Sequence, residues 1–135
     1  MNLHSKQLVL GIDGGGSTTR AALAVVSNAA DLHVVGRGMA GASNFNSCGW
    51  DVATREVQLA IQSAFDSAGL EVHRVAAICL GMSGAGRSSE QQAWKRWAEE
   101  SSVAELTNVV TDAETVLAAG TPDGTGVFFF FFRSE

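Results

Sequence analysis

The sequence has few of the features that mark nucleic-acid-binding, secreted or membrane proteins. It has 9 Lys or Arg against 14 Asp or Glu, and its net charge of −5, without any basic cluster, argues against a nucleic-acid partner. Cys48 and Cys79 stand apart, so neither a metal-binding CxxC pair nor a disulfide framework is indicated, and a reducing cytoplasm fits. The apolar run before Asp13 is too short for a signal peptide or a membrane span. The 3 histidines show no ligand spacing.

The composition indicates one folded domain. Hydrophobic residues make up 46% of the chain and charged residues 17%, which is typical of a soluble globular protein. A length of 135 residues is enough for one domain with a real core.

The most informative segment is a glycine run directly after an apolar stretch. Asp13 ends the stretch, and the residues that follow it are Gly14, Gly15, Gly16, Ser17 and Thr18. A turn without side chains lets a phosphate approach backbone N–H groups, while the carboxylate can hold Mg²⁺ and a hydroxyl can bind a phosphate oxygen. A glycine-rich hairpin turn that Asp13 merely caps explains the same pattern, so both interpretations stay open.

Two common phosphate-binding motifs do not fit this segment. A P-loop needs a Gly-Lys-Ser/Thr sequence that is absent after the glycines, and a dinucleotide fingerprint needs a helix there. Residues 20–26 instead form a short run closed by Val-Val, which predicts a second strand. A strand–turn–strand hairpin with glycines at its tip resembles the first phosphate-binding element of the actin and hexokinase superfamily.

The rest of the chain predicts an α/β order. Residues 7–38 are expected to form an antiparallel three-stranded meander closed by a strand at 33–38. A helix is expected at 51–69, with Asp51 as its N-cap and Gly69 just past its end. The apolar positions of this helix lie on one face: Ala53, Val57, Ala60, Ile61, Ala64, Phe65 and Ala68.

A second helix is expected at 89–100, opened by a capping box of Ser89 and Gln92. Its inward-facing positions are Ala93, Trp94 and Trp97. This spacing of tryptophans is more typical of a core than of a stacking platform. A short third helix is expected at 113–119, ending at Gly120.

Two further strands, at 75–80 and 108–111, are expected to lie parallel to the first strand. Loops then follow strand ends at Asp13, Ser83 and Asp112. Because ligands gather at the carboxyl ends of strands in such sheets, we expect these residues to open onto one cleft.

These pieces together carry a family resemblance. Its segments, in sequence order, are Gly11–Ser17, Ser43–Asn44, Leu80–Gly84, Thr111–Ala113 and Ala118–Gly124. The chain from about Leu8 to Val127 resembles the N-terminal lobe of the BadF/BadG/BcrA/BcrD ATPase family, and within it the N-acetylglucosamine kinases. The resemblance implies a ribonuclease H-like (actin-like ATPase) lobe that uses ATP and Mg²⁺ to phosphorylate an amino sugar.

The resemblance also implies roles for individual residues. Ser17 touches ATP, Asn44 and Ser83 line the sugar pocket, and Asp112 binds the sugar and acts as the base on the attacking hydroxyl. Simpler roles stay open: Asp112 as a helix N-cap, Asn44 as a turn residue, and Ser83 as an ordinary loop hydroxyl.

The end of the sequence departs from the family. Residues 1–122 are expected to form the lobe, whereas 123–135 read as a truncated or frameshifted start of a second lobe, with five Phe at 128–132. A naturally short protein with an apolar core strand is the simpler alternative. Without a second phosphate loop we expect an inactive fragment, and the Phe run is an aggregation hazard.

Two other functions fit the same lobe. One is the activator ATPase of an acyl-CoA dehydratase, whose cysteines hold an iron–sulfur cluster between subunits, and the other is a sugar-binding module without turnover. For either kinase or module we expect a small-molecule sugar and no nucleic-acid or membrane partner. A homodimer is one option for a full-length protein.

Overall fold

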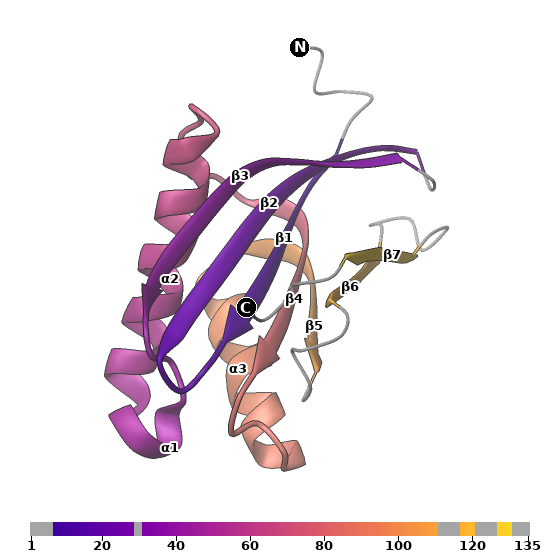
Figure 1. Cartoon of the computed structure of the whole chain (residues 1–135). Helices are drawn as coiled ribbons and strands as arrows, with labels where there is room; N and C mark the ends of the chain where they lie inside the picture. The colour runs from indigo at the N-terminus through magenta and orange to yellow at the C-terminus, as the bar shows by residue number, and fades with distance from the viewer. Residues whose placement is uncertain (1–6, 29–30, 111–116, 121–126, 131–135) are drawn as a thin grey trace.

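The computed structural model describes residues 7–28, 31–110, 117–120 and 127–130, and its centre is a five-stranded sheet. The strands of this sheet are β1 (Gln7–Gly14), β2 (Thr18–Asn28), β3 (Asp31–Gly41), β4 (Val75–Met82) and β5 (Ala104–Val110). Their order across the sheet is β3-β2-β1-β4-β5 (Figure 1). Strands β1, β2 and β3 pair antiparallel, and β4 and β5 add in parallel. The predicted meander and parallel strands are therefore confirmed.

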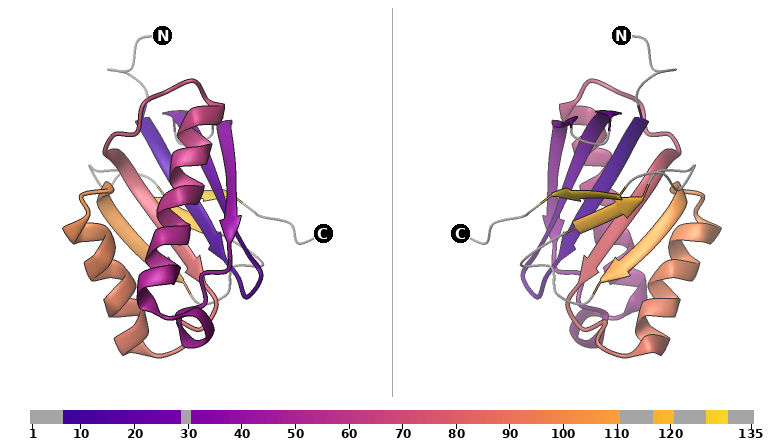
Figure 2. Two further views of the ribbon diagram at one scale, coloured as in Figure 1. Left: turned by 90° about the vertical axis from the view of Figure 1, so that its left-hand side faces the viewer. Right: turned by 90° about the vertical axis from the view of Figure 1, so that its right-hand side faces the viewer.

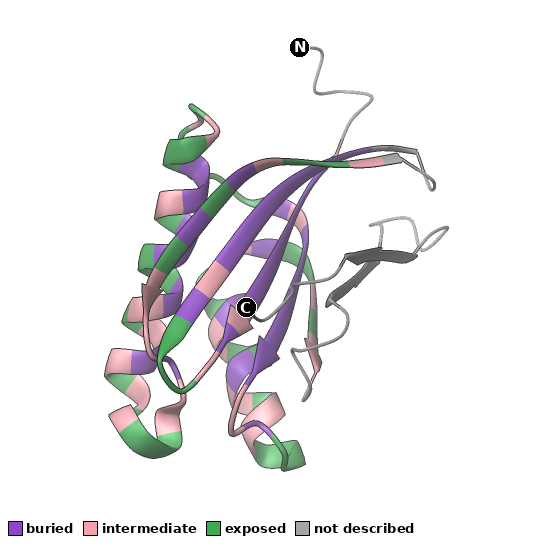
Figure 3. Cartoon of the chain, viewed as in Figure 1, coloured by how far each residue is buried: buried purple, intermediate pink, exposed green. Residues whose placement is uncertain are grey.

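Two helices cover one face of the sheet. Helix α2 (Trp50–Ser67) contacts β3, β2 and β1, and α3 (Ser88–Glu100) contacts β5 (Figure 2). Side chains alternate along β1, so Leu8, Leu10 and Ile12 join the core under the helices while Val9 joins a second cluster. Burial is most continuous along the central strands (Figure 3).

The predicted apolar face of α2 is confirmed, but its N-cap is wrong. Six of the seven predicted positions are buried, and Ala68 packs against them from just beyond the helix. The helix starts at Trp50 with Gly49 as N-cap, which leaves Asp51 in the first turn, where a carboxylate also suits the helix dipole. At the other end Gly69 has a φ of 72°, and the N–H of Leu70 donates to Phe65 O at 3.0 Å, a Schellman ending.

The predicted capping box of α3 is also wrong in detail. The helix starts at Ser88, and the box joins Arg87 and Glu90: Arg87 N–H donates to Glu90 Oε1 at 2.9 Å, and Glu90 N–H donates to Arg87 O at 3.1 Å. The bond involves Glu90 rather than Gln92 because the N-cap is Arg87 rather than Ser89, and Glu90 is the third residue after Arg87. Trp94 is fully buried, in agreement with the predicted core role.

Two short elements differ from the sequence prediction. Helix α1 (Phe45–Cys48) lies between the predicted strand at 33–38 and the predicted helix at 51–69, where no helix or strand was predicted. Leu117–Gly120 is strand β6 rather than the end of a helix, and it pairs antiparallel with β7 (Val127–Phe130). Alanines at 118–119 allow either structure, and the apolar β7 provides the pairing partner. Residues 113–116 lie outside the described residues.

The β6–β7 hairpin crosses the sheet face opposite the helices (Figure 2), and β6 contacts β1, β4 and β5. Within the described residues, the helices fall short of the length and apolar character that a membrane crossing requires.

Candidate functional site

The candidate site lies at the edge of the sheet where the parallel strands end. Gly14 of β1 lies opposite Met82 of β4, and Gly81 of β4 lies opposite Val110 of β5, so the carboxyl ends of these strands share one edge. Asp13, one residue before the end of β1, is half-buried. Asp112 follows β5 in the sequence but lies outside the described residues, so its place in the site stays a prediction.

The glycine turn connects β1 to β2 and leaves backbone donors exposed. Gly15 N–H donates to Thr18 O at 2.8 Å, which closes the turn around Gly16 and Ser17. Both turn residues are exposed, and within the described part of the chain no hydrogen bond uses their main-chain N–H groups. Exposed backbone N–H groups in a turn of this kind can bind a phosphate.

Gly14 and Gly16 are glycine for different reasons. A Cβ at Gly14 would overlap the Met82 side chain and lie 2.5 Å from Ser43 Oγ, so glycine leaves room for these two buried side chains. A Cβ at Gly16 would meet nothing within 4 Å, and its φ is not among the positive values. The fold alone therefore does not require glycine at position 16, whereas the close approach of a ligand to the backbone would.

Asn44 lies at the start of the short helix α1 and caps it. Its side-chain Oδ1 accepts a hydrogen bond from Asn46 N–H at 3.1 Å, and its main-chain O accepts from Cys48 N–H at 3.0 Å. The simpler role for Asn44, a local turn residue, is thus part of the structure. The cap uses only the side-chain oxygen of Asn44. The side-chain NH₂ group is a separate hydrogen-bond donor that a ligand could use.

Two backbone hydrogen bonds and one side-chain hydrogen bond join three separate loops at this edge. Ser83 N–H donates to Gly14 O at 2.8 Å, and Ser43 N–H donates to Gly15 O at 3.1 Å. Asn46 Nδ2 donates to Gly84 O at 3.2 Å. The glycine turn (residues 14–18), the segment between β3 and α2 (42–49, the Asn44 loop) and the segment between β4 and α3 (83–87, the Ser83 loop) are therefore joined, although they are far apart in the sequence.

Arg20 is a further candidate site residue that the sequence pattern alone did not indicate. The register of the hairpin puts Arg20 directly opposite Asp13, and residues opposite one another in an antiparallel pair have side chains on the same face. The tight turn at Gly16–Ser17 would have predicted this pairing, because the length of a hairpin loop fixes its register. A guanidinium beside the glycine turn adds positive charge where a phosphate would bind.

The donor set suits Mg²⁺ better than a tightly held metal. Among the residues that the structure describes, there is no group of three or more His, Cys, Asp or Glu that could hold a metal ion. Mg²⁺ is commonly bound through one or two carboxylates together with water and substrate phosphates. The half-buried carboxylate of Asp13, beside a turn predicted to bind phosphate, fits that arrangement.

The mixed five-stranded sheet and the helices that flank it have an actin-like fold. A crystal structure of a proposed N-acetylglucosamine kinase from Chromobacterium violaceum has the same fold, with a TM-score of 0.60 and 22% identity, over 91% of this chain and 48% of that one. The family profile for the BadF/BadG/BcrA/BcrD ATPases matches residues 10–130. The chain belongs to this family.

Two curated relatives are named as sugar kinases. The N-acetyl-D-glucosamine kinase of Dictyostelium discoideum is 35% identical over 127 residues, and the N-acetylmuramic acid/N-acetylglucosamine kinase of Clostridium acetobutylicum is 30% identical over 119 residues. The match to the Dictyostelium protein covers 87% of this chain, and the match to the Clostridium protein covers 88%. The chain spans 38% of the length of each relative.

Proposed function

We propose that this chain is the N-terminal lobe of an ATP-dependent sugar kinase that acts on an amino sugar of the N-acetylglucosamine type. The observation that carries the proposal is the connection of the glycine turn, the Asn44 loop and the Ser83 loop through two backbone hydrogen bonds and one from the Asn46 side chain. A kinase must hold a phosphate chain and an acceptor hydroxyl side by side, and these loops bring the two candidate binding surfaces together.

Each residue has a role in this proposal. The turn at Gly14–Thr18 binds the phosphates of ATP, and Asp13 holds Mg²⁺, which neutralises phosphate charge when bound. Asn44 and Ser83 give directional hydrogen bonds to the sugar. Asp112 orients the acceptor hydroxyl and takes its proton as phosphoryl transfer proceeds.

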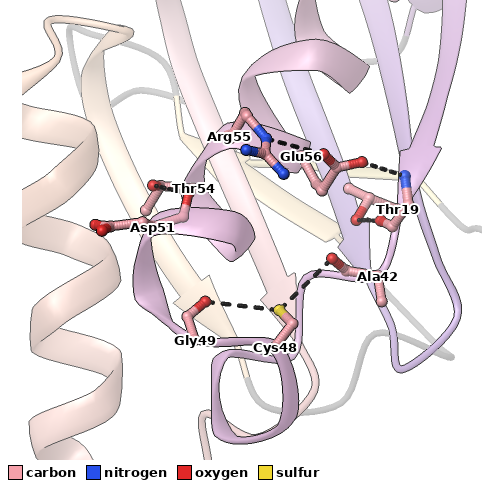
Figure 4. Close-up of polar contacts among 9 residues, drawn as sticks. Thr19, Ala42, Cys48, Gly49, Asp51, Thr54, Arg55 and Glu56 are labelled. Atoms are coloured by element: carbon pink, nitrogen blue, oxygen red, sulfur yellow. Dashed lines mark hydrogen bonds and ion pairs between the residues drawn. The ribbon is translucent and has the colours of Figure 1, made fainter.

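The activator ATPase of an acyl-CoA dehydratase is less consistent with the cysteines. Cys79 has 0% exposure within β4, where it cannot reach a cluster shared with a second subunit. Cys48 is half-buried, with its Sγ 3.7 Å from Ala42 O and 3.6 Å from Gly49 O (Figure 4). Both thiols therefore have local packing roles, and we place the kinase lobe first.

Sugar binding by the purified chain tests the proposal. Isothermal titration with N-acetylglucosamine should show saturable binding, and Ser83→Ala should weaken it about tenfold, the loss expected for one hydrogen bond of about 1.4 kcal/mol. This variant keeps the bond from the Ser83 main chain to Gly14. Ser89→Ala removes an exposed hydroxyl at the start of α3 and is the matched control. Absence of binding by the unmodified chain, or equal losses in both variants, would contradict the proposal.

A further inference from the structure

Two buried hydroxyl groups lie directly behind the candidate ligand-binding residues. Among the described residues, Thr19 and Ser43 are the polar residues that are fully buried, each with 0% exposure. Thr19 follows Ser17 and Thr18 of the glycine turn, and Ser43 precedes Asn44. Neither hydroxyl has the exposure expected of a ligand contact, so their role must be exerted through neighbouring residues.

The geometry fixes how these two hydroxyl groups are bonded. Thr19 Oγ1 lies 2.6 Å from Gly41 O and 2.6 Å from Ser43 Oγ. A hydroxyl has one hydrogen to donate, and a carbonyl can only accept. Thr19 therefore donates to Gly41 O and accepts from Ser43, which orders both hydroxyl groups.

The bonded pair is anchored to the rest of the fold through Gly41, at the end of β3. Gly41 N–H donates to Glu56 Oε1 of α2 at 2.7 Å, and Figure 4 shows Glu56 pointing toward this strand end beside Thr19. Both the N–H and the C=O of Gly41 are thus hydrogen-bonded. The loop that carries Asn44 therefore starts from a residue whose position is fixed. The Ser43 main chain then bonds to Gly15 O at 3.1 Å, which ties that loop to the glycine turn.

We propose that Thr19 and Ser43 are a positioning pair that sets the glycine turn against the Asn44 loop, and so couples phosphate binding to sugar binding. This inference rests on the proposed kinase function. A ligand that orders either loop also orders the other through the pair, so the second ligand loses less conformational entropy when it binds. Removal of the hydroxyl bond weakens this link without removing any group that touches a ligand, and it leaves the bond from the Ser43 main chain to Gly15 O in place.

The test is a thermodynamic linkage measurement on the full 135-residue chain. The affinity for N-acetylglucosamine is measured by titration calorimetry with and without saturating Mg·ATP, for the unmodified chain and for Thr19→Val, Ser43→Ala and Thr19→Ser. In the unmodified chain we expect Mg·ATP to tighten sugar binding about fivefold or more. Thr19→Val, which keeps the shape but loses the hydroxyl, should reduce this gain to less than about twofold. Thr19→Ser, which keeps the hydroxyl, should preserve it.

Each outcome decides between a positioning role and a purely structural one. Far-UV circular dichroism and thermal melts establish that the variants are folded, and Ser43→Ala deletes the same bond should Thr19→Val not fold. Full coupling in Thr19→Val or Ser43→Ala overturns the inference, as does equal loss in Thr19→Ser, which would point to methyl packing. An unmodified chain that binds neither ligand contradicts the kinase proposal itself. An unmodified chain that binds both without coupling contradicts only this inference.

Discussion

At the residue scale, the glycines of the candidate site are glycine for different physical reasons. Gly14 makes room for Met82 and Ser43, whereas Gly16 makes room for nothing in the folded chain. Gly84 combines two demands, because its φ is 86° and a Cβ there would lie 2.5 Å from Asn44 Oδ1. In the sequence these glycines look alike. Only the structure shows that Gly14 is explained by packing, Gly84 by its backbone conformation and packing, and Gly16 by neither.

Gly84→Ala should therefore damage both the fold and the Asn44 loop. A left-handed conformation costs a residue with a side chain roughly 1–2 kcal/mol, and the new methyl group would push against the Asn44 amide. We expect a lower melting temperature and weaker N-acetylglucosamine binding. Gly86→Ala is the matched control, since a Cβ there meets nothing within 4 Å and its φ is not among the positive values. Similar melting temperatures for the two variants would show that the strain at Gly84 is absent.

Asp112→Asn, made in a full-length enzyme that carries this lobe, should lower kcat by about 10²–10⁴-fold, the usual contribution of a general base. Asparagine keeps the shape of the side chain but cannot take the proton of the acceptor hydroxyl. The dissociation constant of ATP should change little, because Asp112 serves the sugar. Steady-state kinetics and nucleotide titration measure the two quantities separately. A large loss of ATP affinity with unchanged kcat would reverse the assigned role.

At the scale of helices and strands, long periodic patterns were predictable and element ends were not. The buried face of α2 follows from repeated apolar spacing over the whole helix, so its interior could be predicted. The first residue of α2 could not be predicted, because an aspartate such as Asp51 suits the N-cap and the first turn of a helix equally well. The one-turn helix α1 is too short for any periodicity, although Asn44 is a typical N-cap residue. Strand β6 depends on its pairing with β7, which no local pattern at 117–120 reveals.

The packing of β3 against α2 gives a prediction at this scale. A Cβ at Gly38 would overlap the backbone O of Ala60, and one at Gly36 would overlap that of Ala64, so the helix lies directly on the strand. Gly38→Ala should lower the free energy of unfolding by roughly 1–3 kcal/mol, the usual cost of overpacking. Chemical denaturation measures the change, and Gly86→Ala again serves as the control. An unchanged denaturation midpoint would mean that α2 can move away from the sheet at little cost.

At the scale of the whole molecule, the loops of the candidate site are concentrated at one edge of one sheet. The chain spans 38% of the length of its curated relatives, and among the described residues the proposed hydrogen-bond donors to phosphate come from a single glycine turn. Sequence order alone predicted that strand ends would meet there, because parallel strands put their carboxyl ends together. The hydrogen bond that joins the turn to the Asn44 loop, and the buried Thr19–Ser43 pair, were not predictable, since they depend on three-dimensional distances between positions 24 or more residues apart.

The last prediction concerns turnover by these 135 residues alone. In-line phosphoryl transfer needs the γ-phosphate held on more than one side, in a site from which water is excluded. Among the described residues, one glycine turn supplies donors from one side, and these 135 residues span 38% of the length of the curated relatives, whose remaining length would be needed to close over the substrates. A coupled assay with N-acetylglucosamine, ATP and Mg²⁺ should therefore show no sugar-dependent ADP release above background. The Clostridium acetobutylicum kinase, tested in parallel, verifies that the assay detects turnover. Sustained sugar-dependent ADP release by the soluble, purified chain would show that its own residues complete the phosphate site.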